Sequence, residues 1–399
     1  MTAAPDREGP PRGGRITAAP DRDGSPNPED GPPASQRACE DCLRRSWLLA
    51  RLGAQFDFAR RRGRDLPLIF DLPDARLIAA IAGAVRPAVE REYERFDAQT
   101  AVAGCHAAGV ETICRCDPAY PRRLATAPGS PAVLHVAGGR DRFVAFLAGD
   151  AVSIVGARRG SPYGLEVARS LGRSLGAAGL TVVSGMALGI DSAVHAGTLE
   201  AAGATVAVLP AGAERPYPAS KRGLYRRIIG GGVAVSELPP GTASRRWTFP
   251  ARNRIIAGLS AMTVVIEAGE RSGSLITAAV AEDLGRELGA VPGRVTSALS
   301  AGTNDLLARG ARVVRDAGDV LDAIFGVGVR TAPAPRDSIS VRPELRELLS
   351  AVGAGRDTLG ALVGPGRTVE HVLTGLAELE VGGHIRRAAG GRYVALMPG

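Results

Sequence analysis

The sequence predicts a doubly wound α/β fold built on a parallel sheet, with a helical module before it and a winged helix after it. Strand-forming runs alternate with helical patterns between residues 152 and 291, which is typical of parallel strands joined by crossover helices. The stretch 152–161 passes from four strand-forming residues through Gly156 into a helix start. Ligands of such folds bind outside the carboxyl ends of the strands, so we expect the functional site there.

Residues 1–38 are predicted to be a disordered tail, because a segment this rich in Pro, Gly, Asp and Arg cannot bury a core. An eight-residue segment that begins at Thr2 recurs almost unchanged at Thr17. Residues 39–115 show helical periodicity and predict a small helical module of the SAM or helix–hairpin–helix kind. Its glycine-rich stretch near 104–109 resembles a helix–hairpin–helix backbone clamp.

The strands and helices of the main domain are expected within residues 116–325. Ala168, Leu171 and Leu175 illustrate the helical spacing, since they fall on one face of a helix. The last strand, at residues 288–291, is expected to pair weakly in the sheet because Gly289 interrupts it. We expect strands at 131–136, 152–155, 180–183, 205–209, 233–236, 262–267 and 288–291, and helices near 164–177, 191–202, 219–229, 251–259 and 274–285.

A linker at residues 326–340, rich in Gly, Pro and Ala, separates this domain from residues 341–399. Three helical patterns and a glycine-centred hairpin predict that the terminal block is a winged helix.

The positive charge is concentrated in the main domain. The net charge of +8 is carried almost wholly by arginine, since Lys221 is the only lysine. Residues 151–325 hold nineteen Lys and Arg against fourteen Asp and Glu, which indicates a polyanionic partner. Residues 341–399 hold seven Arg against six acidic residues, so we expect the winged helix to contact protein. The alternative is a wing that touches DNA through Arg386, Arg387 and Arg392.

No stretch approaches eighteen uninterrupted apolar residues, so we expect a cytoplasmic protein without a membrane partner. In the cytoplasm we expect the five cysteines of the chain to be reduced thiols. They are Cys39, Cys42, Cys105, Cys114 and Cys116. The pairs Cys39/Cys42 and Cys114/Cys116 could form a four-thiolate zinc site, but the second pair has a single intervening residue where zinc pairs usually have two or more. We favour plain thiols, with zinc as the alternative, and expect no metal and no cofactor.

The loop after the strand 152–155 places Arg158 and Arg159 beside a helix N-terminus, whose free N–H groups and positive dipole end favour an anion. It lacks the G-x-G-x-x-G glycines of a dinucleotide site. The pattern therefore predicts contact with a backbone phosphate at Gly156, Arg158 and Arg159. The alternative is that either arginine holds the loop by pairing with a carboxylate such as Glu166.

Two further loops have the same chemistry. Residues 184–191 and 267–274 are rich in small residues, expose backbone N–H groups and end at helix starts. In a parallel sheet both loops fall on the same edge as Gly156, so the three loops would line one groove. The candidate residues are Ser184, Gly185, Ser272, Gly273 and Ser274. Gly185 and Gly189 have the alternative role of allowing a helix to pack closely on a strand.

Two basic segments, 221–227 and 245–254, add Lys221, Arg252 and Arg254 as candidate contacts. Arginines with interleaved aromatic residues suit a single nucleic-acid strand, because phosphates pair with charge and bases stack. Five of the few aromatic residues fall near these loops: Tyr163, Tyr217, Tyr225, Trp247 and Phe249. The alternatives are a solvated helix face for 221–227 and a core role for Trp247 and Phe249.

Residues 152–324 resemble the DprA/Smf family, the DNA-processing proteins of bacterial natural transformation. The run Arg252-Asn-Arg-Ile-Ile-Ala-Gly-Leu-Ser260 is very specific, and Asp117-x-x-Tyr-Pro121 and the terminal winged helix also match. The remaining motifs are Gly156-Ala-Arg-Arg, Ser184-Gly-Met-Ala-Leu-Gly-Ile-Asp191, Tyr217-Pro218, Ser272-Gly-Ser-Leu-Ile-Thr277 and Val291-Pro-Gly293.

The resemblance implies an extended Rossmann-like domain that binds single-stranded DNA, forms a homodimer and helps to load the RecA recombinase onto incoming strands. It implies DNA contacts at eight residues of this sequence: Gly156, Arg158, Arg159, Ser184, Gly185, Lys221, Asn253 and Ser274. Three features depart from the family pattern: the long tail, the cysteine pairs and the weakened strand before Val291-Pro-Gly293.

We therefore expect a protein that binds and protects single-stranded DNA and is not an enzyme. The alternative is a nucleotide phosphoribohydrolase of the related lysine-decarboxylase-like group, which would use the same loops for phosphate. The enzymes of that group share a Pro-Gly-Gly-x-Gly-Thr segment followed by a catalytic Glu. The equivalent loop here, residues 269–274, has no such segment. Asp191 and His195 share a helix face, but no third residue is placed to orient them for catalysis. A purely structural adaptor would not need the converging arginines.

Overall fold

The computed structural model describes Met1 and residues 38–63, 66–331, 342–364 and 367–396. The predicted tail, apart from its two end residues, and most of the predicted linker lie outside these residues, so both stay predictions. None of the described helices is long and apolar enough to cross a membrane.

The main domain is built on a sheet of nine strands in the order β1-β2-β6-β5-β4-β3-β7-β8-β9. In this order, all neighbouring strands from β6 through β3 to β9 are parallel. At the other edge, β1 pairs antiparallel with β2, and β2 pairs antiparallel with β6. The strands are β1 (Glu111–Cys114), β2 (Val133–Ala137), β3 (Ala151–Gly156), β4 (Thr181–Ser184), β5 (Thr205–Val208), β6 (Val233–Ser236), β7 (Met262–Ile266), β8 (Glu287–Ala290) and β9 (Arg312–Val313). The predicted doubly wound fold is confirmed, and the sheet begins a few residues before the predicted boundary at 116.

Helices cover both faces of this sheet, which is why its strands are almost continuously apolar. On one face Ile154 of β3 packs with Leu171 and Leu175 of α9, and on the other Val155 packs with Ile255 of α12. The helices are α7 (Arg122–Ala125), α8 (Arg140–Leu147), α9 (Pro162–Ala177), α10 (Ile190–Glu200), η3 (Ala219–Lys221), α11 (Arg222–Gly231), α12 (Thr248–Leu259), α13 (Gly273–Asp283), α14 (Ala301–Ala308) and α15 (Ala317–Phe325).

The strand order reverses at β3. From there the chain adds β4, β5 and β6 on one side and β7, β8 and β9 on the other. Loops on the two sides of such a switch point diverge and leave a crevice at the carboxyl ends of the strands. The poor strand predicted at 288–291 is present as β8. Gly289 is needed in this strand because the side chain of Met262 packs against it. A Cβ at position 289 would lie 2.5 Å from the methyl carbon of Met262.

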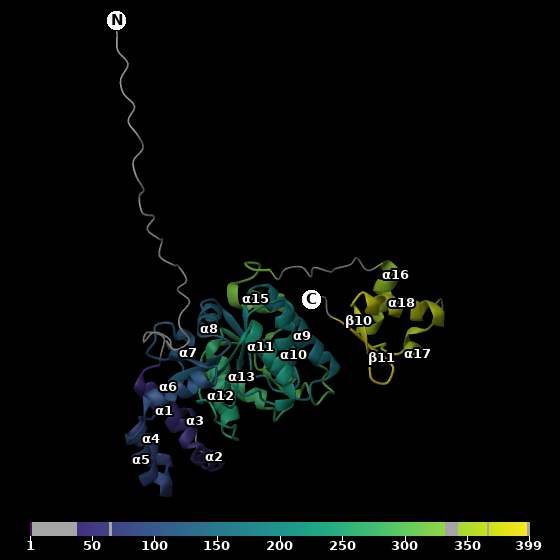
Figure 1. Ribbon diagram of the computed structural model, residues 1–399. Coiled ribbons are helices and arrows are strands. Elements are labelled where there is room, and N and C mark those ends of the chain that lie inside the picture. Colours follow the sequence, from purple (N-terminus) through teal and green to yellow (C-terminus); the bar gives the residue numbers. More distant parts are fainter. Residues whose placement is uncertain (2–37, 64–65, 332–341, 365–366, 397–399) are drawn as a thin grey trace. The chain divides into compact units, whose positions relative to one another are not determined.

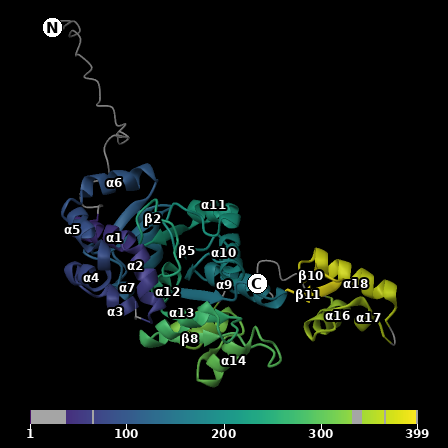
Figure 2. The ribbon, with the colours of Figure 1, turned by 90° about the horizontal axis from the view of Figure 1, so that it is seen from below.

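The N-terminal module is helical, as predicted, and packs against the sheet domain. Trp247, at the start of α12, lies 4.6 Å from Phe56 and 6.0 Å from Phe70 between ring centroids. Helix α2 accordingly lies beside α12 in both views (Figure 1, Figure 2). The module contains α1 (Glu40–Arg51), α2 (Gly53–Arg61), α3 (Leu66–Phe70), α4 (Asp74–Ile81), η2 (Gly83–Val85), α5 (Arg86–Glu94) and α6 (Ala98–Ala107).

The glycine-rich stretch 104–109 does not form the backbone clamp that its composition resembles. It ends α6, where Gly109 takes a left-handed φ of 65°, and the chain continues directly into β1. A clamp needs a second helix after the turn, and here a strand follows.

The C-terminal block has its own core, built around Leu348, Leu376, Leu379 and Tyr393. It contains the three helices and the hairpin on which the winged-helix prediction rests. These are α16 (Pro343–Gly353), α17 (Leu359–Leu362), α18 (Val369–Val381), β10 (Ile385–Ala388) and β11 (Arg392–Ala395).

Candidate nucleic-acid interface

A groove with a volume of about 1020 Å³ lies at the carboxyl edge of the sheet, at the switch point. Its walls come from the loop after β3, the start of α12 and the loop between β7 and α13. We call it the polar groove. It is lined by the predicted residues Gly156, Arg158, Arg252, Asn253, Ser272, Gly273 and Ser274, and also by Arg60, Arg246, Phe249, Glu270 and Arg271.

Gly156 brings the end of β3 against its neighbours. A Cβ at this position would lie 1.9 Å from the carbonyl oxygen of Ile266 and 2.7 Å from Ile190. No side chain fits, because real Cβ atoms do not approach other atoms so closely. Gly156 therefore shapes the groove through its packing.

Arg158 is exposed in the groove and lies over an aromatic ring. Its guanidinium carbon is 5.3 Å from the centroid of Phe249, whose ring is 5.1 Å from that of Tyr217. Within the described residues no carboxylate forms an ion pair with Arg158 or Arg159, so the alternative pairing with Glu166 is not formed. We call Tyr217 and Phe249 the aromatic pair.

Arg159 and Lys221 lie in a hollow beside the polar groove. This hollow is also lined by Arg158, Gly160 and Gly189, so Arg158 borders both depressions. Arg159 is exposed and Lys221 is half-buried. The structure thus brings these three cations together, with Arg158 between the groove and the hollow.

The helix N-terminus that follows Arg159 is not free for a phosphate. Glu267, at the end of β7, accepts hydrogen bonds from the backbone N–H of Ser161, at 2.7 Å, and from the Ser161 hydroxyl. Glu267 reaches this position through a left-handed φ of 49°. A carboxylate therefore already occupies the positive end of α9, and the prediction of a phosphate there is wrong.

The helix N-terminus that opens into the groove belongs to α13. Ser272 caps this helix, with its hydroxyl accepting from the backbone N–H of Ser274 at 3.4 Å. Asn253 holds the same turn, since its Nδ2 donates to the carbonyl oxygen of Gly273 at 3.3 Å. The first N–H groups of α13 lie in the groove wall and favour an anion there.

The floor of the groove is a buried charge pair. Arg252 lies 3.8 Å from Asp191, and its Nη1 donates to the carbonyl oxygen of Val208 at 2.6 Å. Burial raises the pKa of Asp191 above its ordinary value and lowers the pKa of Arg252. Gly185 lies against the guanidinium, because a Cβ there would be 1.7 Å from Nη1. Arg252 therefore supports the groove from below.

Ser184 is wholly buried at the end of β4, where its hydroxyl donates to the carbonyl oxygen of Ile154 at 2.6 Å. Ser184 and Gly185 were predicted as contacts. The structure gives both a packing role beneath the groove, since neither lines it.

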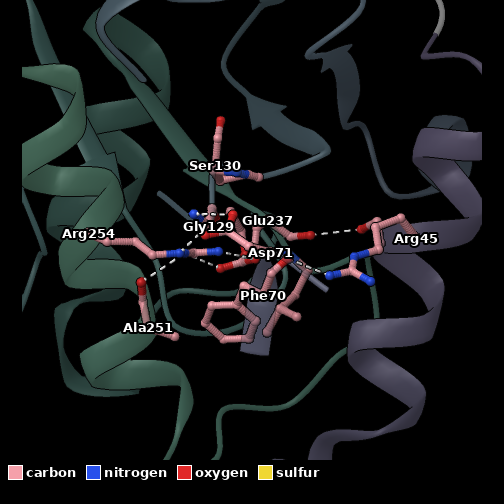
Figure 3. A network of polar contacts seen from close by, with 12 residues as sticks. Arg45, Phe70, Asp71, Gly129, Ser130, Glu237, Ala251 and Arg254 are labelled. Atoms are coloured by element: carbon pink, nitrogen blue, oxygen red, sulfur yellow. Dashed lines mark hydrogen bonds and ion pairs between the residues drawn. The ribbon is translucent and has the colours of Figure 1, made fainter. Parts of the chain in front are cut away.

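Arg254 was predicted to contact DNA, and its position in the structure contradicts this prediction. Its side chain points away from the groove, toward the helical module, and forms a two-pronged ion pair with Glu237 at 2.6 and 2.8 Å (Figure 3). It also donates to the carbonyl oxygens of Gly129 and Ala251, and it lies over the ring of Phe70 at 4.5 Å. All three guanidinium nitrogens are engaged and the residue is only 4% exposed, so Arg254 holds the module to the sheet.

The catalytic pairing considered for Asp191 and His195 is not formed. The Nδ1 of His195 lies 2.7 Å from the hydroxyl of Thr205, and burial lowers the pKa of this histidine to about 3. Asp191 faces Arg252 instead. A neutral buried histidine that faces a threonine is a core residue.

The groove also contains three exposed arginines: Arg60, Arg246 and Arg271. Arg246 belongs to the basic segment 245–254 that the sequence assigns to the groove, whereas Arg60 and Arg271 were missed. Arg271 lies within the recognised loop 267–274, so its place in that loop was the available signal. Arg60 comes from α2, and its contribution depends on how the module packs. We call Arg60, Arg158, Arg246 and Arg271 the groove arginines.

The aromatic residues divide between groove and core. Phe249 lines the groove, whereas Trp247 is 1% exposed and belongs to the core under the module. Tyr225 is also buried, and its hydroxyl donates to the carbonyl oxygen of Ala213. Tyr163 is exposed and lines neither depression.

Fold and site together define a doubly wound α/β protein with an arginine-rich groove at the switch point of its sheet. The chain belongs to the family described as DNA recombination-mediator protein A, whose model matches residues 111–325. The match begins at β1 and ends at α15, so it covers the whole sheet domain.

Relatives in several bacteria are consistent with this family. The putative DNA processing protein DprA of Mycobacterium tuberculosis is 41% identical over 254 residues, which are 62% of this chain and 65% of that protein. Protein Smf of Escherichia coli is 35% identical over 286 residues, covering 69% of this chain and 75% of that protein. The X-ray structure of DNA processing protein A from Streptococcus pneumoniae superposes with a TM-score of 0.56 at 31% identity, over 71% of this chain and 96% of that one.

Proposed function

We propose that the protein binds single-stranded DNA in the polar groove and is not an enzyme. The observation that carries this proposal is the set of groove arginines around Phe249. No described carboxylate forms an ion pair with any of the four, so their charge is available to a ligand. Phosphates pair with such cations, and the half-buried ring of Phe249, which lines the groove, can accept a stacked base.

The arrangement favours a single strand over a duplex. In a duplex the faces of the bases are stacked on one another and are hidden from Phe249. A single strand can place phosphates against Arg158 and the start of α13 while a base stacks on the aromatic pair. The hollow with Arg159 and Lys221 would extend the backbone contact beyond the groove.

The family description supports a role in recombination. As finer parts of the proposal, the protein protects incoming DNA during natural transformation, acts as a homodimer and helps to load the RecA recombinase onto the bound strand.

The absence of catalysis is proposed from three buried acidic and histidine side chains around the groove, whereas the fourth such residue, Glu270, is exposed at its rim and has no histidine beside it in the lining. Asp191 is paired with Arg252 beneath the surface, His195 is buried, and Glu267 is bound to the start of α9. Each of these groups is engaged within the fold, which leaves it poorly placed for acid–base work on a nucleotide.

Binding to a single strand, to a blunt duplex of equal length and to AMP tests this proposal. Fluorescence anisotropy should show the single strand binding more tightly, by about tenfold or more, since one stacked base is worth about 1–3 kcal/mol. Neither metal nor nucleotide should be needed for DNA binding. Equal affinity for the duplex would contradict the proposal, and release of adenine from AMP would favour the phosphoribohydrolase.

A further inference from the structure

Four cysteine sulfurs converge where the helical module meets the edge of the sheet. Cys39 precedes α1 and Cys42 lies in its first turn, whereas Cys114 ends β1 and Cys116 follows it. All four sulfurs lie within 4.8 Å of one another, although Cys39 and Cys116 are 77 residues apart in the sequence. The fold therefore assembles a set of thiols that the function proposed above does not use.

The distances fit a shared metal ion and not a disulfide. The sulfur of Cys116 lies 3.8 Å from the sulfurs of both Cys39 and Cys42. A disulfide bond is about 2.05 Å long. A tetrahedral zinc ion with Zn–S bonds of about 2.3 Å holds its sulfurs about 3.8 Å apart, because the edge of a tetrahedron is about 1.6 times its centre-to-corner distance.

The close spacing of Cys114 and Cys116, which argued against zinc, is resolved by a turn. The backbone N–H of Asp117 donates to the carbonyl oxygen of Cys114 at 2.8 Å, so the chain folds back at once after β1. The turn brings Cys116 back toward Cys114, so the sulfurs of both residues can reach the same ion.

The surroundings are those of a structural site. Cys42 and Cys114 are buried in a small apolar cluster with Ala38, Leu43 and Val133, between α1 and the first two strands. Zinc with four protein ligands has no position left for water or substrate, which distinguishes a structural ion from a catalytic one. Sulfur ligands exclude Mg²⁺ and Ca²⁺, which require oxygen.

We propose that Cys39, Cys42, Cys114 and Cys116 bind one structural Zn²⁺ ion that ties helix α1 to the edge strand β1. The same helix carries Ser46, whose hydroxyl donates to the carbonyl oxygen of Glu237 at 2.7 Å, and Arg45, which contacts the carbonyl oxygen of Phe70. The ion would therefore hold the module in the position that places Arg60 at the groove.

The test is the metal content of the full chain, purified without chelator and without added metal. Mass spectrometry of the metals should find one zinc per chain in the natural sequence. Cys116→Ser and Cys39→Ser, both at exposed positions, should lose it. Cys105→Ala is the matched control, because its sulfur contacts His135 and lies outside the cluster. This variant should retain one zinc.

A second measurement does not depend on how the variants fold. Stripping the metal from the natural protein and titrating with Co²⁺ should produce the visible absorption of a tetrahedral cobalt–thiolate site, saturating at one ion per chain, with a higher melting temperature on binding. A protein without zinc that gives no such absorption would overturn the proposal. So would zinc retained unchanged in Cys39→Ser and Cys116→Ser.

Discussion

Replacing Arg254 with Met is expected to lower the free energy of unfolding by about 3–5 kcal/mol, since breaking a buried ion pair leaves the other charge without a partner. Here that charge is Glu237, which is 5% exposed and receives two hydrogen bonds from Arg254. The melting temperature should fall on the order of 10 °C. Urea and thermal unfolding measure both quantities.

Two variants sharpen this expectation. Arg60→Met, at an exposed arginine without an ion pair among the described residues, should change stability by no more than about 0.5 kcal/mol. Adding Glu237→Gln to Arg254→Met should recover part of the loss, because the unpaired charge is removed. If the Arg254→Met protein is stable but binds DNA more weakly and with a shallower salt slope, the account is contradicted and Arg254 contacts DNA.

Replacing both Arg158 and Arg159 with Ala is expected to weaken single-strand binding by about 25-fold at 0.1 M salt, if each contacts one phosphate. The logarithmic salt slope should become shallower by about 1.4, or about 0.7 for each lost contact. The loss should be equal for every base sequence, because phosphate contacts carry no base information. Anisotropy titrations at several salt concentrations provide all three values.

The matched control uses two arginines of similar exposure outside both depressions, Arg226→Ala with Arg227→Ala on α11. They should leave affinity and slope nearly unchanged. If the Arg158 and Arg159 variant binds normally with an unchanged slope but melts at a lower temperature, these arginines hold the loop and leave the list of contacts.

The arrangement of the sheet was largely predictable from the sequence, because each buried parallel strand is a short apolar run and each helix shows its own periodicity. Strand β1 was missed since Glu111–Cys114 offers only four residues beside a helical pattern. Strand β9, with two residues, has even less signal. Such edge strands are defined by their partners, and pairing is not visible in a local pattern.

The site was predictable as a place but not side chain by side chain. Arg158, Arg252 and Arg254 are the same residue type in loops or helix starts, yet one is exposed, one supports the floor and one ties down the module. What separates them is the position of Asp191 and Glu237, which come from distant segments. A charge pattern therefore identifies a basic edge, and the tertiary partners decide which charges remain for a ligand.

The central claim is that the strand lies in the polar groove, and zero-length ultraviolet cross-linking of a thymine-rich single strand tests it most directly. Mass spectrometry of the digested complex should place the cross-links on peptides that contain Tyr217 and Phe249, the aromatic pair beside Arg158. Phe249→Leu should remove those on its peptide. Cross-links confined to α15 or to the C-terminal block, with none at the aromatic pair, would contradict the account.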